Sequence, residues 1–280
     1  MELKNAILND FKNFETTDKS KVKKDFDEFI ELLDNGEIRS AIKKDNKWIA
    51  NEWVKKGILL GFKLGEVVDY SIEGFSFYDK DTYPAKTFNN NKRRIVPGGT
   101  SLRKGSYLNE NVIVMPPTYV NVGAYVDSDT LLDSNVLVGS CAQVGSNCHI
   151  SAGVQIGGVL EPINSTPVIV EDNVFIGGNS GIYEGVLVKK GAVISSGVVI
   201  TASTPIYDIV NEEIIKKDND GVLKIPENAV VVPGTRPINT SFGKNENLSI
   251  STPIIIKYKD KSTSAKLSLE EALRWYTINK

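Results

Sequence analysis

The sequence has little of what many catalytic sites are built from. Its 280 residues include one histidine and two cysteines. A single histidine excludes metal sites that need several imidazole ligands, and it leaves only His149 as a histidine base for a serine or cysteine nucleophile. The two cysteines, Cys141 and Cys148, are too few and too close together in the sequence for a disulfide framework. We therefore interpret both as small buried hydrophobic residues.

An excess of charge of one sign is also missing. The chain has 33 Lys and Arg against 35 Asp and Glu, a formal net charge of −2, and no stripe of basic and aromatic residues. We therefore expect no nucleic-acid partner. The first residues, MELKNAILNDFKNFE, include acidic side chains and no long apolar run. Neither a signal peptide nor a membrane span is expected, and a cytoplasmic location is predicted.

What the sequence does contain is a repeat of six residues. Stepping by six from Val96 to Ile156, and again from Val170 to Ile206, lands on an aliphatic residue at each step. A second column, four places after each of the first ten anchors, holds only small or β-branched residues. This period is typical of a parallel β-helix, in which short strands stack on neighbouring coils. An α-helix would instead show a period of 3.6. The anchors are Val96, Leu102, Leu108, Val114, Val120, Val126, Leu132, Val138, Val144, Ile150, Ile156, Val170, Ile176, Ile182, Val188, Ile194, Ile200 and Ile206.

Three hexads to a coil would stack the repeat into about six coils spaced by about 4.8 Å. Glycines near the anchors are expected at corners where the chain turns sharply. Stacking accounts for nearly all residues of the repeat, so breaks in the frame are the candidates for function. These corner glycines are Gly123, Gly139, Gly145, Gly177 and Gly191.

The frame breaks after Ile156, and the next anchor, Val170, lies fourteen residues further on. Hexads cannot absorb this stretch, which predicts a loop over 158–167 that leaves the rod. Loops that project from rigid scaffolds often bind ligands. The alternative interpretation is a passive excursion without a function.

The flanking segments predict two smaller parts. Residues 1–94 carry helical periodicity around Phe26 and Phe29, which indicates a small helical domain of the α+β kind. The rod is expected over 95–234, with an interruption at 211–220 before Ile225 and Val231 resume it. A C-terminal extension over 235–280 should hold a strand at 254–256 and a short helix that begins at Ser268. The fold class is mainly β.

A rod of this kind can carry several chemistries. A γ-class carbonic anhydrase needs three histidine ligands and is excluded. Hexapeptide acyltransferases that use one catalytic histidine remain possible. His149 directly precedes an anchor, so a histidine without a catalytic role is the simpler interpretation.

Several motifs carry a resemblance to one family. The stretch beginning at Asn121 reads NVGAYVDSDTLLDSNVLVGSCAQVGSNCHISAGVQIGGVLEP, and it is accompanied in order by RRIVPGG, VIVEDNVFIG, TPIYD and VVVPG. Together they strongly resemble the tetrahydrodipicolinate N-succinyltransferases over about residues 94–235. The resemblance implies a left-handed β-helix in cytoplasmic homotrimers. It also implies transfer of a succinyl group from succinyl-CoA to the amine of the ring-opened substrate, in diaminopimelate and lysine biosynthesis, with no permanently bound cofactor and no metal.

The resemblance also assigns roles to residues. Asp133 matches the family's substrate-binding and proposed catalytic aspartate, and Arg94 matches an arginine that holds a substrate carboxylate. A carboxylate can take a proton from the attacking amine, and a guanidinium fork suits a carboxylate partner. A turn aspartate and a solvated arginine are the structural alternatives. For the CoA ester we expect contacts at Gly158, Glu161, Gly177 and Gly178.

Two departures leave the substrate open. A second acidic residue of some family members is replaced here by Gly181, and Ser134-Asn135 follow Asp133 where the family usually has Thr-Trp. Glu184 lies three residues beyond Gly181 and occupies another place on the coil. Either the second carboxylate is dispensable, or the chain acylates a related amino dicarboxylate or uses acetyl-CoA. A non-catalytic scaffold is the more distant alternative, and it should lack both the frame break and the outward pair of Arg94 and Asp133.

Overall fold

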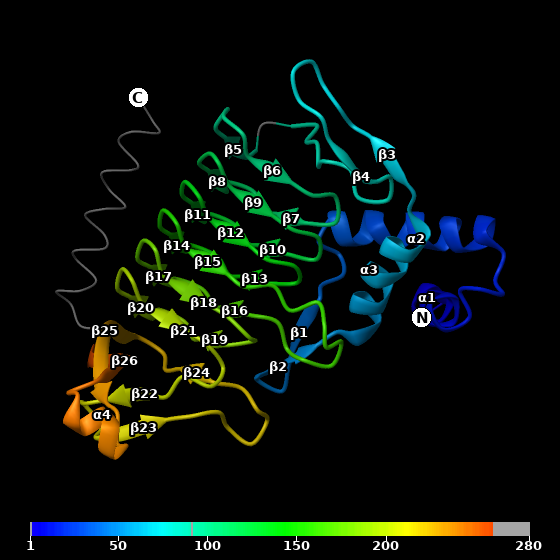
Figure 1. Ribbon diagram of the computed structural model, residues 1–280. Helices are drawn as coiled ribbons and strands as arrows, with labels where there is room; N and C mark the ends of the chain where they lie inside the picture. The colour runs from blue at the N-terminus through cyan, green and yellow to red at the C-terminus, as the bar shows by residue number, and fades with distance from the viewer. Residues whose placement is uncertain (1, 91, 260–280) are drawn as a thin grey trace.

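Most of the chain is a ladder of very short strands wound into a rod (Figure 1). The computed structural model describes residues 2–90 and 92–259. The strands of the rod form three parallel sheets, which we call the first, second and third faces in chain order. Each strand pairs with the strand one coil further on, as Leu131–Leu132 does with His149–Ile150. This is the arrangement of a parallel β-helix.

The strand bounds follow the repeat. The first face holds β5 (Arg94–Ile95), β8 (Ile113–Val114), β11 (Leu131–Leu132), β14 (His149–Ile150), β17 (Phe175–Ile176) and β20 (Val193–Ile194). The second holds β6 (Ser101–Leu102), β9 (Tyr119–Val120), β12 (Leu137–Val138), β15 (Gln155–Ile156), β18 (Gly181–Ile182) and β21 (Val199–Ile200). The third holds β7 (Tyr107–Leu108), β10 (Tyr125–Val126), β13 (Gln143–Val144), β16 (Ile169–Val170), β19 (Leu187–Val188) and β24 (Lys224–Ile225).

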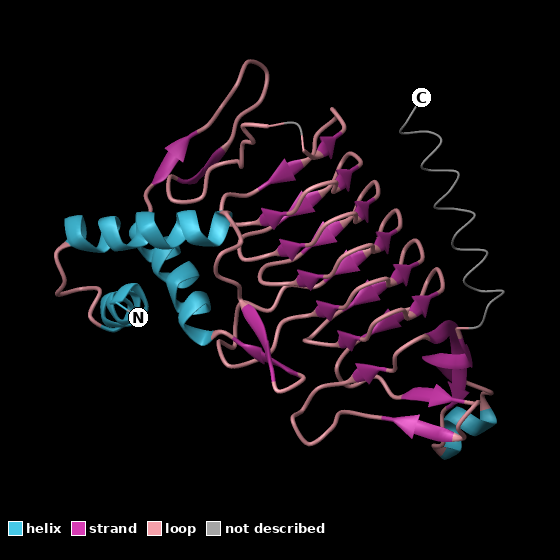
Figure 2. Ribbon diagram, turned by 180° about the vertical axis from the view of Figure 1, so that it is seen from behind, coloured by secondary structure: helices cyan, strands magenta, loops and turns pink. Residues whose placement is uncertain are grey.

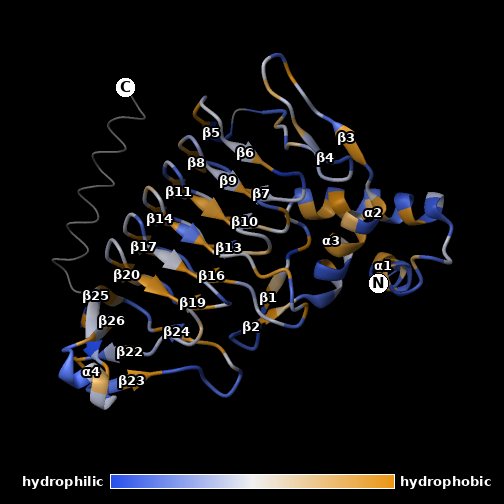
Figure 3. Ribbon diagram, viewed as in Figure 1, coloured by the Kyte–Doolittle hydropathy of each residue, from blue (hydrophilic) through white to orange (hydrophobic). Residues whose placement is uncertain are grey.

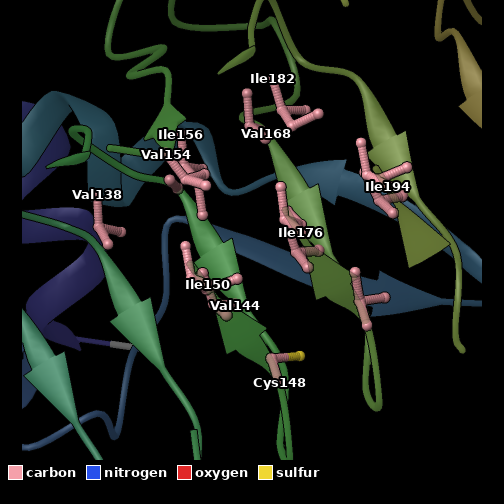
Figure 4. Packing of buried hydrophobic residues seen from close by; sticks show 14 of the residues in the cluster. Val138, Val144, Cys148, Ile150, Val154, Ile156, Val168, Ile176, Ile182 and Ile194 are labelled. Carbon is pink, nitrogen blue, oxygen red and sulfur yellow. The ribbon is translucent and has the colours of Figure 1, made fainter. Parts of the chain in front are cut away.

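The second residue of each strand points into the rod. From Leu102 to Ile200, every anchor is at most 6% exposed, and hydrophobic positions recur in successive strands (Figure 3). Figure 4 shows anchors such as Ile150 and Ile176 stacked on neighbouring coils. The second column is also buried from Ser106 to Val154. Both predicted inward columns are therefore confirmed over this stretch.

The start of the predicted frame is wrong by one residue. Ile95, not Val96, pairs with Val114 and packs against the core of the rod. The chain then needs one residue more than a hexad to reach Leu102. Gly98 and Gly99 take it up with positive φ angles of 136° and 86°, a conformation that glycine adopts without strain.

The end of the frame also differs from the prediction. Ile206 is buried, but it lies in β22 (Ile206–Asp208), which pairs with β23 and β26 rather than with the third face. The place of a sixth anchor on that face belongs to Ile225, which pairs with Val188. Val231 continues the first face by pairing with Ile194. The predicted resumption at Ile225 and Val231 is confirmed.

The corners turn at the third place after the anchor. Positive φ angles fall there on Gly123 and Gly191, and also on asparagines such as Asn135, because glycine and asparagine tolerate the left-handed region. The prediction of sharp turns was wrong for three other glycines, which directly follow anchors and have no positive φ. A Cβ atom there would lie 2.2 to 2.4 Å from the neighbouring coil or loop, so close packing is what requires them. These are Gly139, Gly145 and Gly177.

Helices and two hairpins precede the rod and lie on one side of it (Figure 2). The phenyl rings of Phe26 and Phe29 anchor their hydrophobic core, as the helical periodicity predicted. Val122 and Cys141 of the rod join the same core, so the helices are packed directly onto a corner of the coils. The elements are α1 (Glu2–Lys12), α2 (Lys19–Asp34), β1 (Ala41–Lys44), β2 (Lys47–Ala50), α3 (Glu52–Leu64), β3 (Val67–Asp69) and β4 (Tyr78–Lys80).

The other end of the rod is closed by a cap. The strand predicted at 254–256 is confirmed within β26, whereas the helix predicted from Ser268 lies outside the described residues. No helix in the described ranges is long and apolar enough to cross a membrane. The cap elements are β22, β23 (Glu213–Ile215), β25 (Ala229–Pro237), α4 (Ser241–Asn245) and β26 (Ser249–Tyr258).

Asp208 ties the cap together. Its buried carboxylate accepts hydrogen bonds from the Tyr258 hydroxyl at 2.7 Å, from the Val210 and Asn211 backbone and from the Asn211 side chain. Burial acts to raise the pKa of this carboxyl, but the hydrogen bonds outweigh it and lower the pKa from its ordinary value of 3.8. The Tyr258 hydroxyl responds in the opposite sense, because burial and the neighbouring carboxylate raise its pKa to about 12.

We expect Asp208→Asn to destabilise the protein by about 2 kcal/mol or more at neutral pH. The new amide would present donors to the Tyr258 hydroxyl and to the Asn211 amide, so the buried side chain at position 208 could no longer accept from both. Thermal unfolding monitored by circular dichroism measures the change. The matched control is Asp27→Asn, which removes an exposed ion pair with Lys23 and should cost less than about 0.5 kcal/mol.

The pH dependence gives a second readout. Because the pKa of Asp208 is lowered in the folded state, the carboxylate contributes its full stabilisation above 3.8 and loses it as the pH falls through the folded value. The stability difference between the wild-type protein and Asp208→Asn should therefore shrink in acid. A difference that stays constant down to pH 3 would contradict this role for the charged form.

Candidate functional site

An open groove of about 890 Å³ lies beside the second face. One wall is the loop that leaves the rod after Ile156, the opposite wall is the segment 217–222, and the floor lies on the coils. The loop contributes Gly158 and Glu161, both exposed. The frame break recognised in the sequence therefore lines a cavity, as expected for a loop with a function.

The start of the loop is fixed by close contacts with the coils on either side of it. The Val159 amide donates to the Ser140 carbonyl at 3.0 Å, and the Gly157 amide donates to the Ile182 carbonyl at 2.8 Å. Gly139 and Gly158 face each other so closely that a Cβ on Gly139 would lie 2.2 Å from the Gly158 nitrogen. The glycine pair is thus required for the loop to leave at this point.

The Tyr183 ring covers Gly181, the position at which the resemblance indicates a second acidic residue in some family members. A Cβ on Gly181 would lie 2.4 Å from the Tyr183 ring, and one on Gly157 would lie 2.8 Å from it. The ring therefore rests on two glycines and forms part of the groove floor. Within the described residues its hydroxyl makes no hydrogen bond, so it is available to a molecule in the groove.

Glu184 does not replace the missing carboxylate at Gly181. Its backbone has a positive φ of 54°, which places it at a corner. Its carboxylate accepts a hydrogen bond from the Ala202 amide on the next coil at 3.1 Å. Glu184 borders the groove, but its side chain links two coils.

Asp133 lies on the first face, directly after β11. One oxygen accepts a hydrogen bond from the Ser134 amide at 2.7 Å, the same local contact that Asp127 makes with Ser128. The repeat accounts for this oxygen, as the alternative of a turn aspartate predicted. The other oxygen has no hydrogen-bond partner within the described residues, so the half-buried carboxylate keeps an acceptor for a ligand.

Arg94 differs from its two basic neighbours. Lys92 pairs with Glu110, and Arg93 donates to the Leu108 carbonyl at 2.5 Å. The exposed guanidinium of Arg94 has no ion pair or hydrogen bond in the described parts of the chain. It is therefore the cation of this cluster that is free to bind an anion such as a carboxylate.

Arg94 and Asp133 share one face of the rod but lie on different coils. Their strands, β5 and β11, are separated by β8, which corresponds to about 10 Å along the rod. The groove with Gly158 and Tyr183 lies beside the second face. A single chain thus divides the predicted site residues between two surfaces and does not bring them together.

Gly177 and Gly178 lie outside the groove, at the corner that joins the first face to the second. A Cβ on Gly177 would lie 2.4 Å from the Ser196 nitrogen, and the Gly178 carbonyl accepts a hydrogen bond from the Gly197 amide at 3.0 Å. Contact between coils accounts for both residues without a ligand.

The remaining candidate nucleophiles and bases have structural surroundings. His149 is half-buried and its ring stacks on Phe175 with 4.7 Å between ring centroids, as expected for a histidine in a stack of coils. Cys141 and Cys148 are buried and form no disulfide. Burial raises the pKa of Cys141 to about 11 and that of Cys148 to about 12, which keeps both thiols protonated at neutral pH.

A second cavity of about 640 Å³ adjoins the groove and shares four lining residues with it, namely Asn164, Thr166, Asp220 and Val222. Its walls carry lysines and carboxylates, several of them already paired, as Lys43 is with Glu171 at 2.8 Å. Sequence reasoning did not find this surface, because Lys43 and Asp220 meet only through the fold, and it did not find Tyr183. The departure at Gly181 was the one signal that pointed towards Tyr183.

The repeat places the protein in a known class. Residues 167–202 match a family model described as the hexapeptide repeat of succinyl-transferase. Residues 2–64 match one described as the N-terminal part of tetrahydrodipicolinate N-succinyltransferase. The fold and the repeat thus define a hexapeptide-repeat transferase.

Curated relatives specify the family. Proteins named 2,3,4,5-tetrahydropyridine-2,6-dicarboxylate N-succinyltransferase are similar over most of the chain. The relative from Ralstonia nicotianae is 48% identical over 88% of this chain and 86% of its own. That from Buchnera aphidicola is 46% identical over 88% and 87%, and that from Pseudoalteromonas translucida is 44% identical over 98% of both. The chain belongs to the tetrahydrodipicolinate N-succinyltransferase family.

Proposed function

We propose that this protein transfers the succinyl group of succinyl-CoA to the amine of ring-opened tetrahydrodipicolinate, a step of diaminopimelate and lysine biosynthesis in the cytoplasm. The observation that carries the proposal is the 44% identity to a succinyltransferase along 98% of both chains. The groove beside the loop and the free Arg94 and Asp133 side chains supply the surfaces that the reaction requires.

The reaction forms an amide and breaks a thioester. The amine nitrogen attacks the thioester carbon, CoA leaves as the thiol, and one proton must pass from the nitrogen to the leaving sulfur. In our proposal the free oxygen of Asp133 takes or orients that proton. Arg94 holds a carboxylate of the acceptor. Neither step draws on a bound metal or a permanent cofactor.

The CoA ester is assigned to the groove. Gly158 and Glu161 on its wall are the proposed contacts. Gly177 and Gly178, which lie outside the groove at the corner between the first and second faces, are proposed as further contacts. Backbone N–H groups at glycine-rich corners are suited to stabilise the negative charge that develops on the thioester oxygen.

We further propose a homotrimer of left-handed β-helices with the active sites between neighbouring rods. The division of the site residues supports this assembly, because the first face of one subunit would meet the groove of the next. Residues 1–94 would form the N-terminal domain, 95–234 the catalytic β-helix with its loop at 158–167, and 235–280 the C-terminal extension.

The direct test of the activity is a transfer assay. Purified protein is incubated with succinyl-CoA or acetyl-CoA and a panel of amino dicarboxylates, and products are identified by mass spectrometry. We expect succinylation of ring-opened tetrahydrodipicolinate. Exclusive transfer from acetyl-CoA, or to another dicarboxylate, would instead support the alternative raised by Gly181 and Ser134-Asn135.

The role of Asp133 is tested by Asp133→Asn. The amide keeps the shape and can still accept from the Ser134 amide, but it cannot take a proton. We expect turnover to fall by about 10² to 10⁴ fold, the usual contribution of a general base.

Arg94→Lys gives the matched contrast. Lysine keeps the charge but loses the two-pronged fork, so the Michaelis constant for the dicarboxylate should rise while that for the CoA ester stays near the wild-type value.

An Asp133→Asn enzyme with more than about a tenth of wild-type turnover would contradict the assignment of Asp133 as the base. His149 and Glu184 would then be the next bases to replace.

A further inference from the structure

Lys55 is a charged side chain buried where the helices meet the rod. It belongs to α3 and is 0% exposed. Its ammonium group donates a hydrogen bond of 2.6 Å to the carbonyl oxygen of Ser165, in the loop that forms one wall of the groove. A contact between residues 110 positions apart thus joins the helices to the loop.

The loop has a second attachment to the same helices. Leu160 is partly buried and packs against the hydrophobic core that α2 and α3 build. Between these two attachments, Glu161, Pro162 and Asn164 line the groove. The loop therefore lies between the helices on one side and the groove on the other.

A buried ammonium group is costly to place, because removal from water disfavours its charged form. Burial lowers the pKa of Lys55 accordingly. An apolar side chain of similar length would fill the same space without that cost, but it could not donate to the Ser165 carbonyl. The hydrogen bond to the loop is thus the contribution that lysine makes here and a hydrophobic residue would not.

We propose that Lys55 is a positioning residue, which holds the 157–168 loop in the conformation that receives the acyl-CoA ester. The inference rests on the proposed function of the groove. It assigns a role in acyl-donor binding to the N-terminal helices, which contribute no residue to the groove itself. Leu160 holds one end of this wall, and the hydrogen bond from Lys55 to Ser165 holds the other.

The test is Lys55→Met, which keeps the length and apolar stem and removes the ammonium group. The Michaelis constant for succinyl-CoA should rise about ten-fold, as expected for loss of a charge-assisted hydrogen bond that organises the bound state. Turnover and the Michaelis constant for the dicarboxylate should stay within about two-fold of wild type, because Asp133 and Arg94 lie on another face. Amide hydrogen exchange over 157–168 should accelerate about ten-fold as well.

The matched control is Lys86→Met. Lys86 is also a buried lysine that donates to a backbone carbonyl, that of Asp34 at 2.9 Å, but it does not contact the loop. Both variants should lower the melting temperature, while only Lys55→Met should change loop exchange and the acyl-donor constant. Equal effects of the two variants on these readouts would overturn the proposal and reduce Lys55 to a general structural role.

A second variant keeps the proposal testable if Lys55→Met does not fold. Leu160→Ala weakens the other attachment of the loop and should change the same two readouts in the same direction. Unchanged loop exchange and an unchanged succinyl-CoA constant in a folded variant would overturn the inference. Failure of the proposed function is distinguishable, because the wild-type protein would then transfer no succinyl group while the exchange comparison still reports on the loop.

Discussion

The stacking of aliphatic side chains between coils is the constraint on which the rest of the structure depends. Each strand of the three faces has only two residues, so it is stable only because the coils above and below repeat its pairing and its inward anchor. This explains why the inner columns accept so few residue types. It also explains why the candidate groove lies where the repeat is interrupted, since a ligand-binding group inside the stack would break the packing of two neighbours.

The loop that interrupts the repeat is held in place by the coils beside it. The loop after Ile156 leaves through a glycine pair that no larger residue could form, and it returns to the stack at Val168. Lys55 and Leu160 attach the loop to the helices. The groove therefore has one wall supported by the N-terminal helices and a floor supported by the coils. The groove thus combines a base of stacked coils with a wall whose position depends on a few contacts.

The sequence predicted the periodic part of this fold because each aliphatic anchor indicates a side chain that points into the rod. The predicted frame was wrong by one residue at Ile95, because Gly98 and Gly99 absorb an extra residue without changing the apolar pattern. The prediction overextended the frame to Ile206, since an aliphatic residue buried in the cap looks the same as one buried in the stack. Gly181 was visible as a departure, but the Tyr183 ring that fills its place was not, because only the coil geometry brings the two together. The roles of Arg94 and Asp133 came from the resemblance, and the structure adds that each has a free polar group.

The proposed site residues of one chain lie on two faces of the rod, and mixing of subunits tests whether two neighbouring rods complete each site. Asp133→Asn disables the first face, and Glu161→Trp fills the groove beside the second. The two variants are co-expressed with different affinity tags, and trimers that contain both are isolated. If each site joins two neighbouring rods, one site in three is intact in such a trimer, and about a third of wild-type turnover should return. Activity no higher than that of the separate variants would place the whole site within one chain and contradict the proposed shared site.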